Sequence, residues 1–175
     1  LMPIYHELVD PLRCTSSVIR STDGGVTWSS PVPVDAANQD NDEPDIIELP
    51  DGRLLCAMRT NAGAETMMWQ SFSTDRGLTW SPSAPMAFTG HAPYLLRTTR
   101  GALLCAHRMP GTSLHVSGDE GATWGGNVPI DTCIGAYQSM CELPDGTVLM
   151  VYYEEGPGSR IVWARLDVRP AEAPE

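Results

Sequence analysis

Short apolar runs separated by turn motifs fill the chain, and the most regular of them come in pairs. Each pair consists of two runs rich in aliphatic residues that flank a tight turn ending in glycine. This pattern predicts a β-hairpin, because such runs favour strands and glycine favours turns. The three predicted hairpins cover residues 46–59, 94–108 and 139–153, with turns at Pro50-Asp51-Gly52, Thr99-Arg100-Gly101 and Pro144-Asp145-Gly146.

A second motif, the octet Ser-x-Asp-x-Gly-x-Thr-Trp, occurs at residues 21–28, 73–80 and 117–124. Its aspartate can accept backbone N–H bonds across a turn, and the glycine two residues later tolerates positive φ. Its threonine suits an outgoing strand, and its tryptophan supplies an apolar anchor. Each octet therefore predicts a hairpin turn, closed in the three copies by Asp23, Asp75 and Asp119. A calcium loop is the competing interpretation, but such loops use several carboxylates and each octet offers one.

The two motifs share one period. The turn glycines Gly52, Gly101 and Gly146 lie 49 and 45 residues apart (101 − 52 and 146 − 101). Two hairpins in about 45 to 50 residues indicate a four-stranded blade, so the predicted fold class is an all-β propeller. The chain supplies about three and a half blades, whereas a closed ring has four to eight. The predicted blades are 1–40 (partial), 41–88, 89–133 and 134–168, followed by a tail, 169–175.

Composition agrees with this fold and narrows the partners. Turn formers are abundant, with 16 glycines and 15 prolines in 175 residues, and the net charge of −11 argues against nucleic acid as a partner. Cys56 and Cys105 occupy matching strand contexts and are expected to be buried. No Cys-x-x-Cys pair, histidine ligand spacing, signal peptide or membrane span is visible. We expect no metal and no cofactor, and the sequence leaves the compartment open.

Counting from each turn glycine aligns residues across the repeats. Nine positions before it stand Glu43, Ala92 and Tyr137, and seven positions after it stand Arg59, Arg108 and Tyr153. These positions face each other at the hairpin end remote from the turn, with Glu43 beside Arg59 or Thr60. Equivalent positions of neighbouring blades point to one mouth of a propeller, so the polar members are expected to converge.

Taken singly, these residues have ordinary structural interpretations. An arginine that ends a strand is usually a solvated rim charge, Glu43 lies in an acidic loop sequence, and Tyr137 fits a strand aromatic. Taken together, Arg59 and Arg108 form an anion pocket, with a potential base and nucleophile in Glu43 and Tyr137. The planar fork of arginine favours a carboxylate as the anion.

These motifs resemble those of the sialidases (neuraminidases) of the Asp-box superfamily, over nearly the whole chain. Glu43-Pro44, followed by Arg59, is similar to the family's glutamate and second triad arginine, and Arg108 is similar to the third. Tyr137 in Ala-Tyr-Gln-Ser-Met resembles the nucleophile, and Glu154 the acid that steadies the first triad arginine. The resemblance implies a six-bladed β-propeller, of which this chain is the C-terminal part.

The resemblance also implies a reaction. Sialidases release terminal sialic acid, whose carboxylate the arginines bind. Because that carboxylate repels a second one, a neutral tyrosine is a suitable nucleophile for a retaining mechanism. A phenol of pKa about 10 is a weak nucleophile at neutral pH, so Glu43 is expected to take the proton of Tyr137 during attack.

Two further elements of the family are not matched in this chain. They are an arginine in an Arg-Ile-Pro context and an aspartate that acts as acid/base; Arg13 and Arg20 stand in other contexts, and Asp10 precedes a proline in a predicted loop. The chain is therefore expected to be a fragment of an exo-α-sialidase acting on sialylated glycans. Two alternatives stay open: a non-catalytic Asp-box propeller that binds glycans or proteins, and a propeller glycosidase for another acidic sugar.

Overall fold

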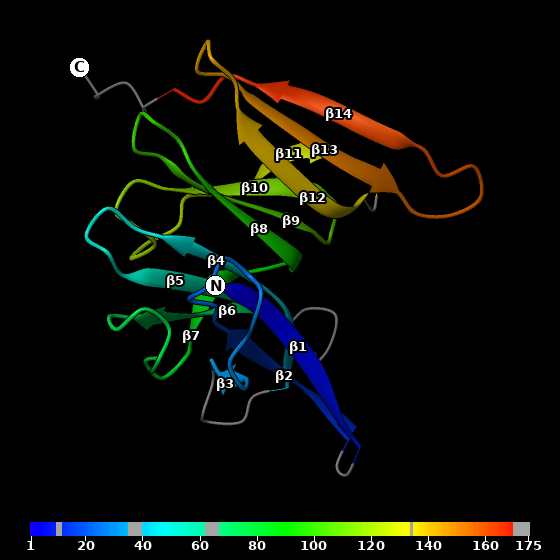
Figure 1. Cartoon of the computed structure of the whole chain (residues 1–175). Helices are drawn as coiled ribbons and strands as arrows, with labels where there is room; N and C mark the ends of the chain where they lie inside the picture. Colours follow the sequence, from blue (N-terminus) through cyan, green and yellow to red (C-terminus); the bar gives the residue numbers. More distant parts are fainter. Residues whose placement is uncertain (10–11, 35–39, 62–66, 134, 170–175) are drawn as a thin grey trace. The chain divides into compact units, whose positions relative to one another are not determined.

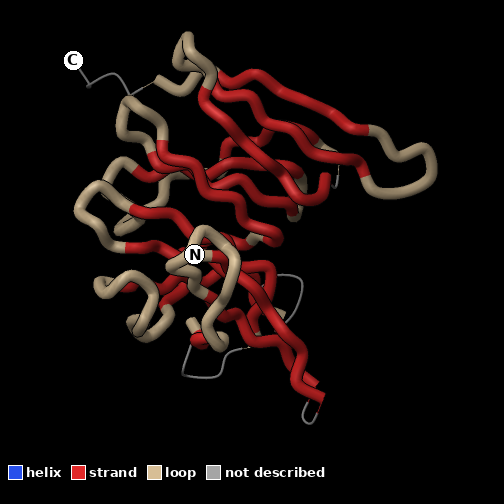
Figure 2. Tube along the Cα trace, viewed as in Figure 1, coloured by secondary structure: helices blue, strands red, loops and turns tan. Residues whose placement is uncertain are grey.

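The computed structural model describes residues 1–9, 12–34, 40–61, 67–133 and 135–169, which Figure 1 traces in sequence order. Within these ranges the regular structure consists of β-strands, as Figure 2 shows. The strands form four antiparallel sheets, and each sheet is built from strands that are consecutive in sequence. The prediction of an all-β chain is thereby confirmed. No helix in the described ranges is long and apolar enough to cross a membrane.

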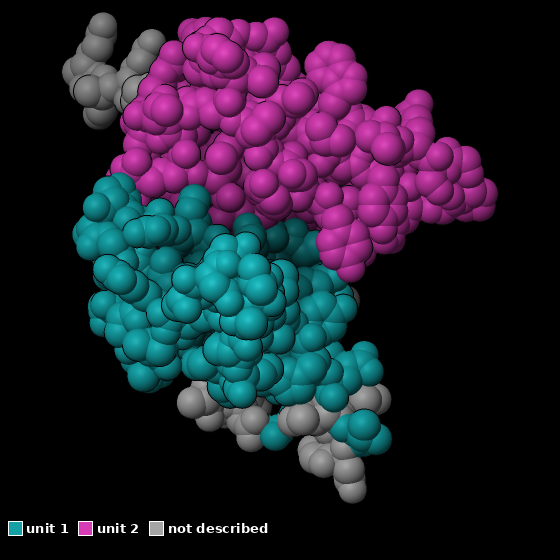
Figure 3. Space-filling view, viewed as in Figure 1, with its two compact units in different colours: residues 1–93 teal, residues 94–175 magenta. Residues whose placement is uncertain are grey.

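The chain divides into two compact units at Pro93, coloured separately in Figure 3. The first unit, Leu1–Pro93, contains two of the sheets. One sheet consists of β1 (Met2–Val9), β2 (Leu12–Ile19) and β3 (Val32–Pro33). The other consists of β4 (Asn41–Glu48), β5 (Leu54–Thr60), β6 (Met67–Ser73) and β7 (Ala84–Thr89), in that order.

The second unit, Tyr94–Glu175, contains the remaining sheets. The third sheet consists of β8 (His91–Arg97), β9 (Leu103–Arg108), β10 (Thr112–Ser117) and β11 (Val128–Asp131), and β8 begins in the last residues of the first unit. The fourth consists of β12 (Gly135–Glu142), β13 (Val148–Glu154) and β14 (Ile161–Leu166). The two four-stranded sheets thus come from the middle of the sequence, and the two three-stranded sheets come from its ends. Of the predicted tail, residues 170–175 lie outside the described residues.

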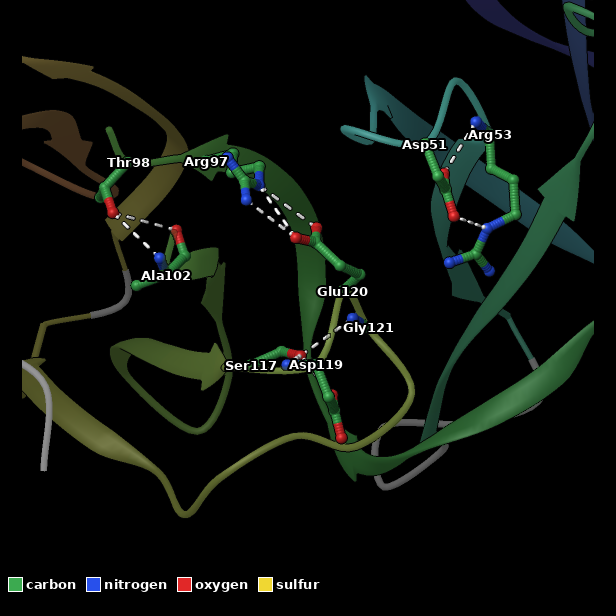
Figure 4. Close-up of polar contacts among 9 residues, drawn as sticks. All are labelled: Asp51, Arg53, Arg97, Thr98, Ala102, Ser117, Asp119, Glu120 and Gly121. Carbon is green, nitrogen blue, oxygen red and sulfur yellow. Dashed lines mark hydrogen bonds and ion pairs between the residues drawn. The ribbon is translucent and has the colours of Figure 1, made fainter. Parts of the chain in front are cut away.

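The turns of the three predicted hairpins share one geometry. In the β4–β5 turn, Leu49 N–H donates to the Arg53 carbonyl at 2.8 Å, and Gly52 N–H donates to the Leu49 carbonyl at 2.9 Å. The same two bonds recur in the β8–β9 and β12–β13 turns. The three turn glycines have φ of 83°, 92° and 81°, a left-handed conformation in which a side chain is strained. Figure 4 shows side chains of two of these turns, with Asp51 bonded to Arg53 and Thr98 to Ala102.

The octets, which we call Asp boxes, are closed turns that connect β2 to β3, β6 to β7 and β10 to β11. In the third box Asp119 accepts hydrogen bonds from the Ser117 hydroxyl at 2.8 Å and the Thr123 N–H at 2.8 Å. The Gly121 N–H donates to Ser117 Oγ, and Figure 4 shows Ser117, Asp119 and Gly121 of this turn. The Thr123 hydroxyl donates to the second carboxylate oxygen. The threonine therefore belongs to the turn, and the expectation that it opens the next strand is wrong.

The hydrogen bonds of the box also explain the acidity of its aspartates. The threonine hydroxyl, the threonine N–H and the serine hydroxyl stabilise the ionised form, and they lower the pKa of Asp23, Asp75 and Asp119 to about 2. With all three carboxylates engaged in their own turns, the calcium interpretation loses its ligands. Within the described residues, no group of three or more acidic, histidine or cysteine side chains is arranged to hold a metal ion.

Each unit has its own apolar core. In the first unit, Val18, Val34, Cys56 and Met58 form a buried cluster against Ile46, Trp69 and Trp80. In the second unit, a cluster centred on Leu104, Met140 and Met150 joins β9, β12 and β13. Cys56 and Cys105 are both fully buried, at matching positions of β5 and β9. The cores bury the middle of these strands, and the candidate site residues lie at the strand ends.

Candidate active site

Glu43 lies at a β-bulge in β4. Asp42 pairs with Arg59 across the ladder, pairing resumes at Asp45 with Ala57, and the bulge falls between them. Pro44 has no N–H to offer the ladder, which accounts for the break, and Glu43 adopts a left-handed backbone with φ of 47°. The predicted register is therefore wrong in detail, because the ladder partner of Arg59 is Asp42. Glu43 still reaches Arg59 from the bulge, with 3.3 Å between its Oε2 and Arg59 Nη1.

The Glu43 carboxylate is held on two sides. Its side chain is 7% exposed, and the same Oε2 accepts a hydrogen bond from the Ala92 N–H at 3.1 Å. Arg59 is the more open partner, with 25% of its side chain exposed. A guanidinium and a backbone N–H therefore fix the orientation of this largely buried carboxylate.

Asp42 and Asn61, which sequence reasoning missed, complete this cluster. Asp42 Oδ1 lies 3.7 Å from Arg59 Nε, and Asn61 Nδ2 donates to Asp42 Oδ2 at 3.1 Å. Burial raises the pKa of the Asp42 carboxyl, while Asn61 and Arg59 oppose the shift. Both residues are sequence neighbours of predicted ones: Asp42 precedes Glu43, and Asn61 lies two residues after Arg59. That proximity was the only signal of their role.

Tyr137 occupies the corresponding bulge of the second unit. Ala136 pairs with Tyr153, pairing resumes at Ser139 with Val151, and Tyr137 has φ of 49°. Ala92, the third residue of the aligned column, has φ of 51°. A left-handed backbone is uncommon outside glycine and tends to occur at functional sites. The position nine residues before each turn glycine therefore carries the same unusual backbone in all three repeats.

Arg108 lies against the ring of Tyr137. Its guanidinium carbon is 5.8 Å from the ring centroid, within the range of a cation–π contact, and its side chain is 14% exposed. The Tyr153 ring stacks near Tyr137, with 6.3 Å between centroids. Tyr137 itself is 56% exposed, so its phenol is accessible within the second unit. These residues place a guanidinium against an exposed tyrosine ring.

Glu154 and Glu155, which are adjacent in sequence, bind two different arginines. Glu154 binds Arg160 across the β13–β14 hairpin, with 2.6 Å between its Oε2 and Arg160 Nε. Glu155 contacts Arg108, with 3.3 Å between its Oε1 and Arg108 Nη1. The resemblance predicts that Glu154 steadies the first triad arginine. That arginine is not matched in this chain, so the role of Glu154 stays a prediction. The structure thus joins Glu43 to Arg59 in the first unit and Arg108 to Tyr137 in the second. Asp10 lies outside the described residues.

Residues 14–167 match the family of BNR repeat-like domains. The chain belongs to this family. Its predicted membership in the Asp-box (BNR) superfamily is thereby confirmed, and the fold is that of a partial β-propeller of the sialidase type. A comparison with the curated proteins found no match.

Several solved structures share the fold of this BNR repeat-like chain. A protein of unknown function from Dyadobacter fermentans is 22% identical, with a TM-score of 0.85 over 96% of this chain and 50% of its own. The NanB sialidase from Streptococcus pneumoniae is 19% identical, with a TM-score of 0.70 over 88% of this chain and 27% of its own. An endo-arabinase from Bacteroides thetaiotaomicron is 12% identical, with a TM-score of 0.64 over 90% of this chain and 67% of its own. The chain spans half or less of the length of the first two.

Proposed function

We propose that the protein is a retaining exo-α-sialidase that releases terminal sialic acid from glycans. The observation that carries the proposal is the shared bulge. Glu43 and Tyr137 stand at the same repeat position with the same left-handed backbone; Glu43 contacts Arg59 of its own hairpin, and Tyr137 contacts Arg108 of the preceding hairpin. Such a backbone costs about 1–3 kcal/mol and tends to persist at functional sites; the repeat also has it at Ala92, and the side chains of Glu43 and Tyr137 are what this position adds in the other two copies. Membership in the BNR repeat-like family and structural similarity to NanB support the same reading.

In this proposal the arginines bind the substrate carboxylate. Arg59 and Arg108 are partly exposed, and each is held on one side by an acidic residue. The planar fork of a guanidinium suits the carboxylate that sialic acid carries beside its anomeric carbon.

Tyr137 acts as the nucleophile. Its phenolic oxygen forms a bond to the anomeric carbon while the bond to the leaving oxygen breaks, and Glu43 accepts the phenolic proton. The Arg108 guanidinium over the Tyr137 ring stabilises the negative charge that develops on the phenol during attack. Water then hydrolyses the glycosyl–tyrosine bond, with net retention of configuration. In the first step the leaving oxygen takes up a proton from solvent water, and in the second step the phenol recovers its own proton.

Two alternative functions use the same arginines. The similarity to an endo-arabinase shows that the fold is compatible with glycosidases for other sugars, so another acidic sugar is the nearest alternative substrate. A glycan-binding propeller without catalysis is the second alternative. It would keep the two arginines and make no use of an accessible phenol at Tyr137.

The substitution Tyr137→Phe, made in the full-length protein, tests whether Tyr137 is the nucleophile. Release of a fluorophore from an aryl α-sialoside should fall to background, because the phenyl ring keeps the packing and removes the nucleophile. Tyr5→Phe, at an exposed tyrosine of β1, is the matched control and should retain full turnover. Unchanged turnover in Tyr137→Phe would rule out the nucleophile assignment, and turnover of another acidic glycoside alone would favour the alternative substrate.

A further inference from the structure

In the first unit, Asp42 and Arg59 each have a buried polar atom without a hydrogen bond to the described part of the chain, and these two atoms face each other. Asp42 Oδ1 and Arg59 Nε are both buried, and neither has a hydrogen-bond partner among the described residues. They lie 3.7 Å apart across the β4–β5 ladder, close enough for an ion pair. A buried donor or acceptor left without a partner is unfavourable, so a small approach of these atoms would stabilise the pair.

We propose that Asp42 is a positioning residue for Arg59. The proposal rests on the proposed function, in which Arg59 binds the substrate carboxylate. Asp42 faces the Nε edge of the guanidinium, and Glu43 bonds Nη1 at 3.3 Å. Arg59 Nη2 makes no hydrogen bond within the described residues, which leaves it for the ligand. With Glu43 bonded to Nη1 and Asp42 close to Nε, the guanidinium is restrained in the orientation in which it would receive a carboxylate.

Asp42 is itself fixed from the side opposite Arg59. Asn61 Nδ2 donates to Asp42 Oδ2 at 3.1 Å and to Asp40 Oδ1 at 3.3 Å, and the Asn61 N–H donates to the Asp40 carbonyl at 2.8 Å. The Asp42 residue is 8% exposed, so it has little room to change rotamer. A carboxylate anchored in this way can transmit its position to the arginine, as supporting residues do for groups that bind a ligand.

The charges around Asp42 make this support dependent on pH. Asp40 and Glu43 face Asp42 from its own segment, and Arg59 at the end of β5 and Asn61 just after it face it from the neighbouring strand. The Cys14 thiol of β2 also lies near Asp42, and the charge of Glu7 in β1 acts on that thiol. With Asp42 and Glu43 both ionised, their charges outweigh the single charge of Arg59 and repel an anionic ligand. Burial raises the pKa of Asp42, so its proton is retained to a higher pH than usual.

Ligand affinity should therefore be highest when Asp42 is protonated and should fall as the pH rises through its pKa. A bound carboxylate adds a further negative charge, so binding itself should take up a proton. Asp42→Asn keeps an oxygen that can accept from Arg59 Nε and removes the charge. Asp42→Ala removes both, which separates positioning from electrostatics.

The experiment is calorimetric binding of an unsaturated sialic acid analogue that carries a carboxylate, from pH 4.5 to 8, on the full-length protein. The wild type should bind more weakly as the pH rises. Asp42→Asn should bind within about threefold of the acidic wild type with a flattened pH profile, and Asp42→Ala should bind at least tenfold more weakly throughout. Glu48→Gln, an exposed acid at the other end of β4, is the matched control and should follow the wild type.

The outcomes separate the two proposals. If the wild type binds and Asp42→Ala binds equally well, Asp42 does not position Arg59 and the inference is overturned while the proposed function stands. If the wild type binds no carboxylate sugar at all, the proposed function itself fails. The Arg59 Nε–H resonance, which reports on its partner without any substrate, should shift in Asp42→Ala and be largely restored in Asp42→Asn. An unshifted resonance in Asp42→Ala also contradicts the proposal.

Discussion

Gly135→Ala tests the packing directly beneath Tyr137. A Cβ added at Gly135 would lie 2.4 Å from Thr112 Oγ1 and 2.6 Å from Tyr152 Cδ2, where ordinary contacts begin at 3.4 Å. Relief therefore needs a movement of about 1 Å (3.4 − 2.4) by one side or the other. β12 can approach β10 and β13 this closely because residue 135 has no side chain.

Neither neighbour can yield without losing an interaction. Thr112 and Tyr152 are 0% and 4% exposed. Thr112 Oγ1 accepts the Gly135 N–H at 3.2 Å, and the Tyr152 hydroxyl donates to Asp131 Oδ2 at 2.8 Å. Overpacking costs about 1–3 kcal/mol and a lost hydrogen bond about 0.5–1.5 kcal/mol. We expect Gly135→Ala to lower the free energy of unfolding by about 2–3 kcal/mol, which corresponds to a fall in Tm of about 4–12 °C.

Denaturant titration and thermal melts measure this change, with Gly126→Ala as the matched control. A Cβ at Gly126 would meet nothing within 4 Å, so the control should lie within about 0.5 kcal/mol of the wild type. On the proposed function, kcat of the folded Gly135→Ala protein should also fall, because Tyr137 lies two residues away on the displaced strand. Equal stabilities of the two alanine variants would refute the packing argument.

Three further perturbations address other parts of the molecule. Met58→Ala empties a fully buried position in the first unit and should lower the free energy of unfolding by about 2–5 kcal/mol in denaturant titrations; a loss below about 1 kcal/mol would contradict its core role. Arg108→Ala should weaken a carboxylate inhibitor by about 2–5 kcal/mol in calorimetry, whereas Arg53→Ala, at an exposed turn, should leave it unchanged; equal effects would place Arg108 on the rim. Because the Asp-box hydrogen bonds lower the pKa of Asp119 to about 2 from 3.8, the stability that they contribute is fully present above about pH 4 and is lost as the pH falls through 2. Asp119→Asn should flatten this acid dependence in urea midpoints measured from pH 5 to pH 2, and an unchanged slope would refute the assignment.

The sequence was sufficient for the local elements of the fold. An Asp box closes through hydrogen bonds that span at most four residues, such as Thr123 N–H to Asp119, so its geometry depends on the octet alone. The same is true of the glycine turns, whose two bonds lie within five consecutive residues. Their spacing then predicted four antiparallel sheets, because hairpins of fixed length at a fixed period leave few ways to pair strands. The threonine of the box was misread because β propensity describes a pleated surface and ignores a hydroxyl that bonds within its own turn.

For the candidate site, the sequence aligned residues but not their backbone. Glu43, Ala92 and Tyr137 fell into one column by counting, yet their left-handed φ cannot be read from residue types that normally avoid it. The bulge arises from how each strand meets its neighbours, and it displaces the ladder by one position. A one-residue displacement turns side chains to the opposite face of a strand.

The choice of ion-pair partners belonged to the tertiary structure alone. Asp42 and Glu43 are adjacent acids, as are Glu154 and Glu155, and composition cannot say which member of each pair meets an arginine. In the folded chain both Asp42 and Glu43 approach Arg59, while Glu155 takes Arg108 and Glu154 takes Arg160. An ion pair depends on atoms that lie within 4 Å, and the strand ends on which these residues lie are set by bulges and by long-range pairing. The repeat thus predicted where along the chain the candidate site residues lie, and the three-dimensional register determined which side chains they contact.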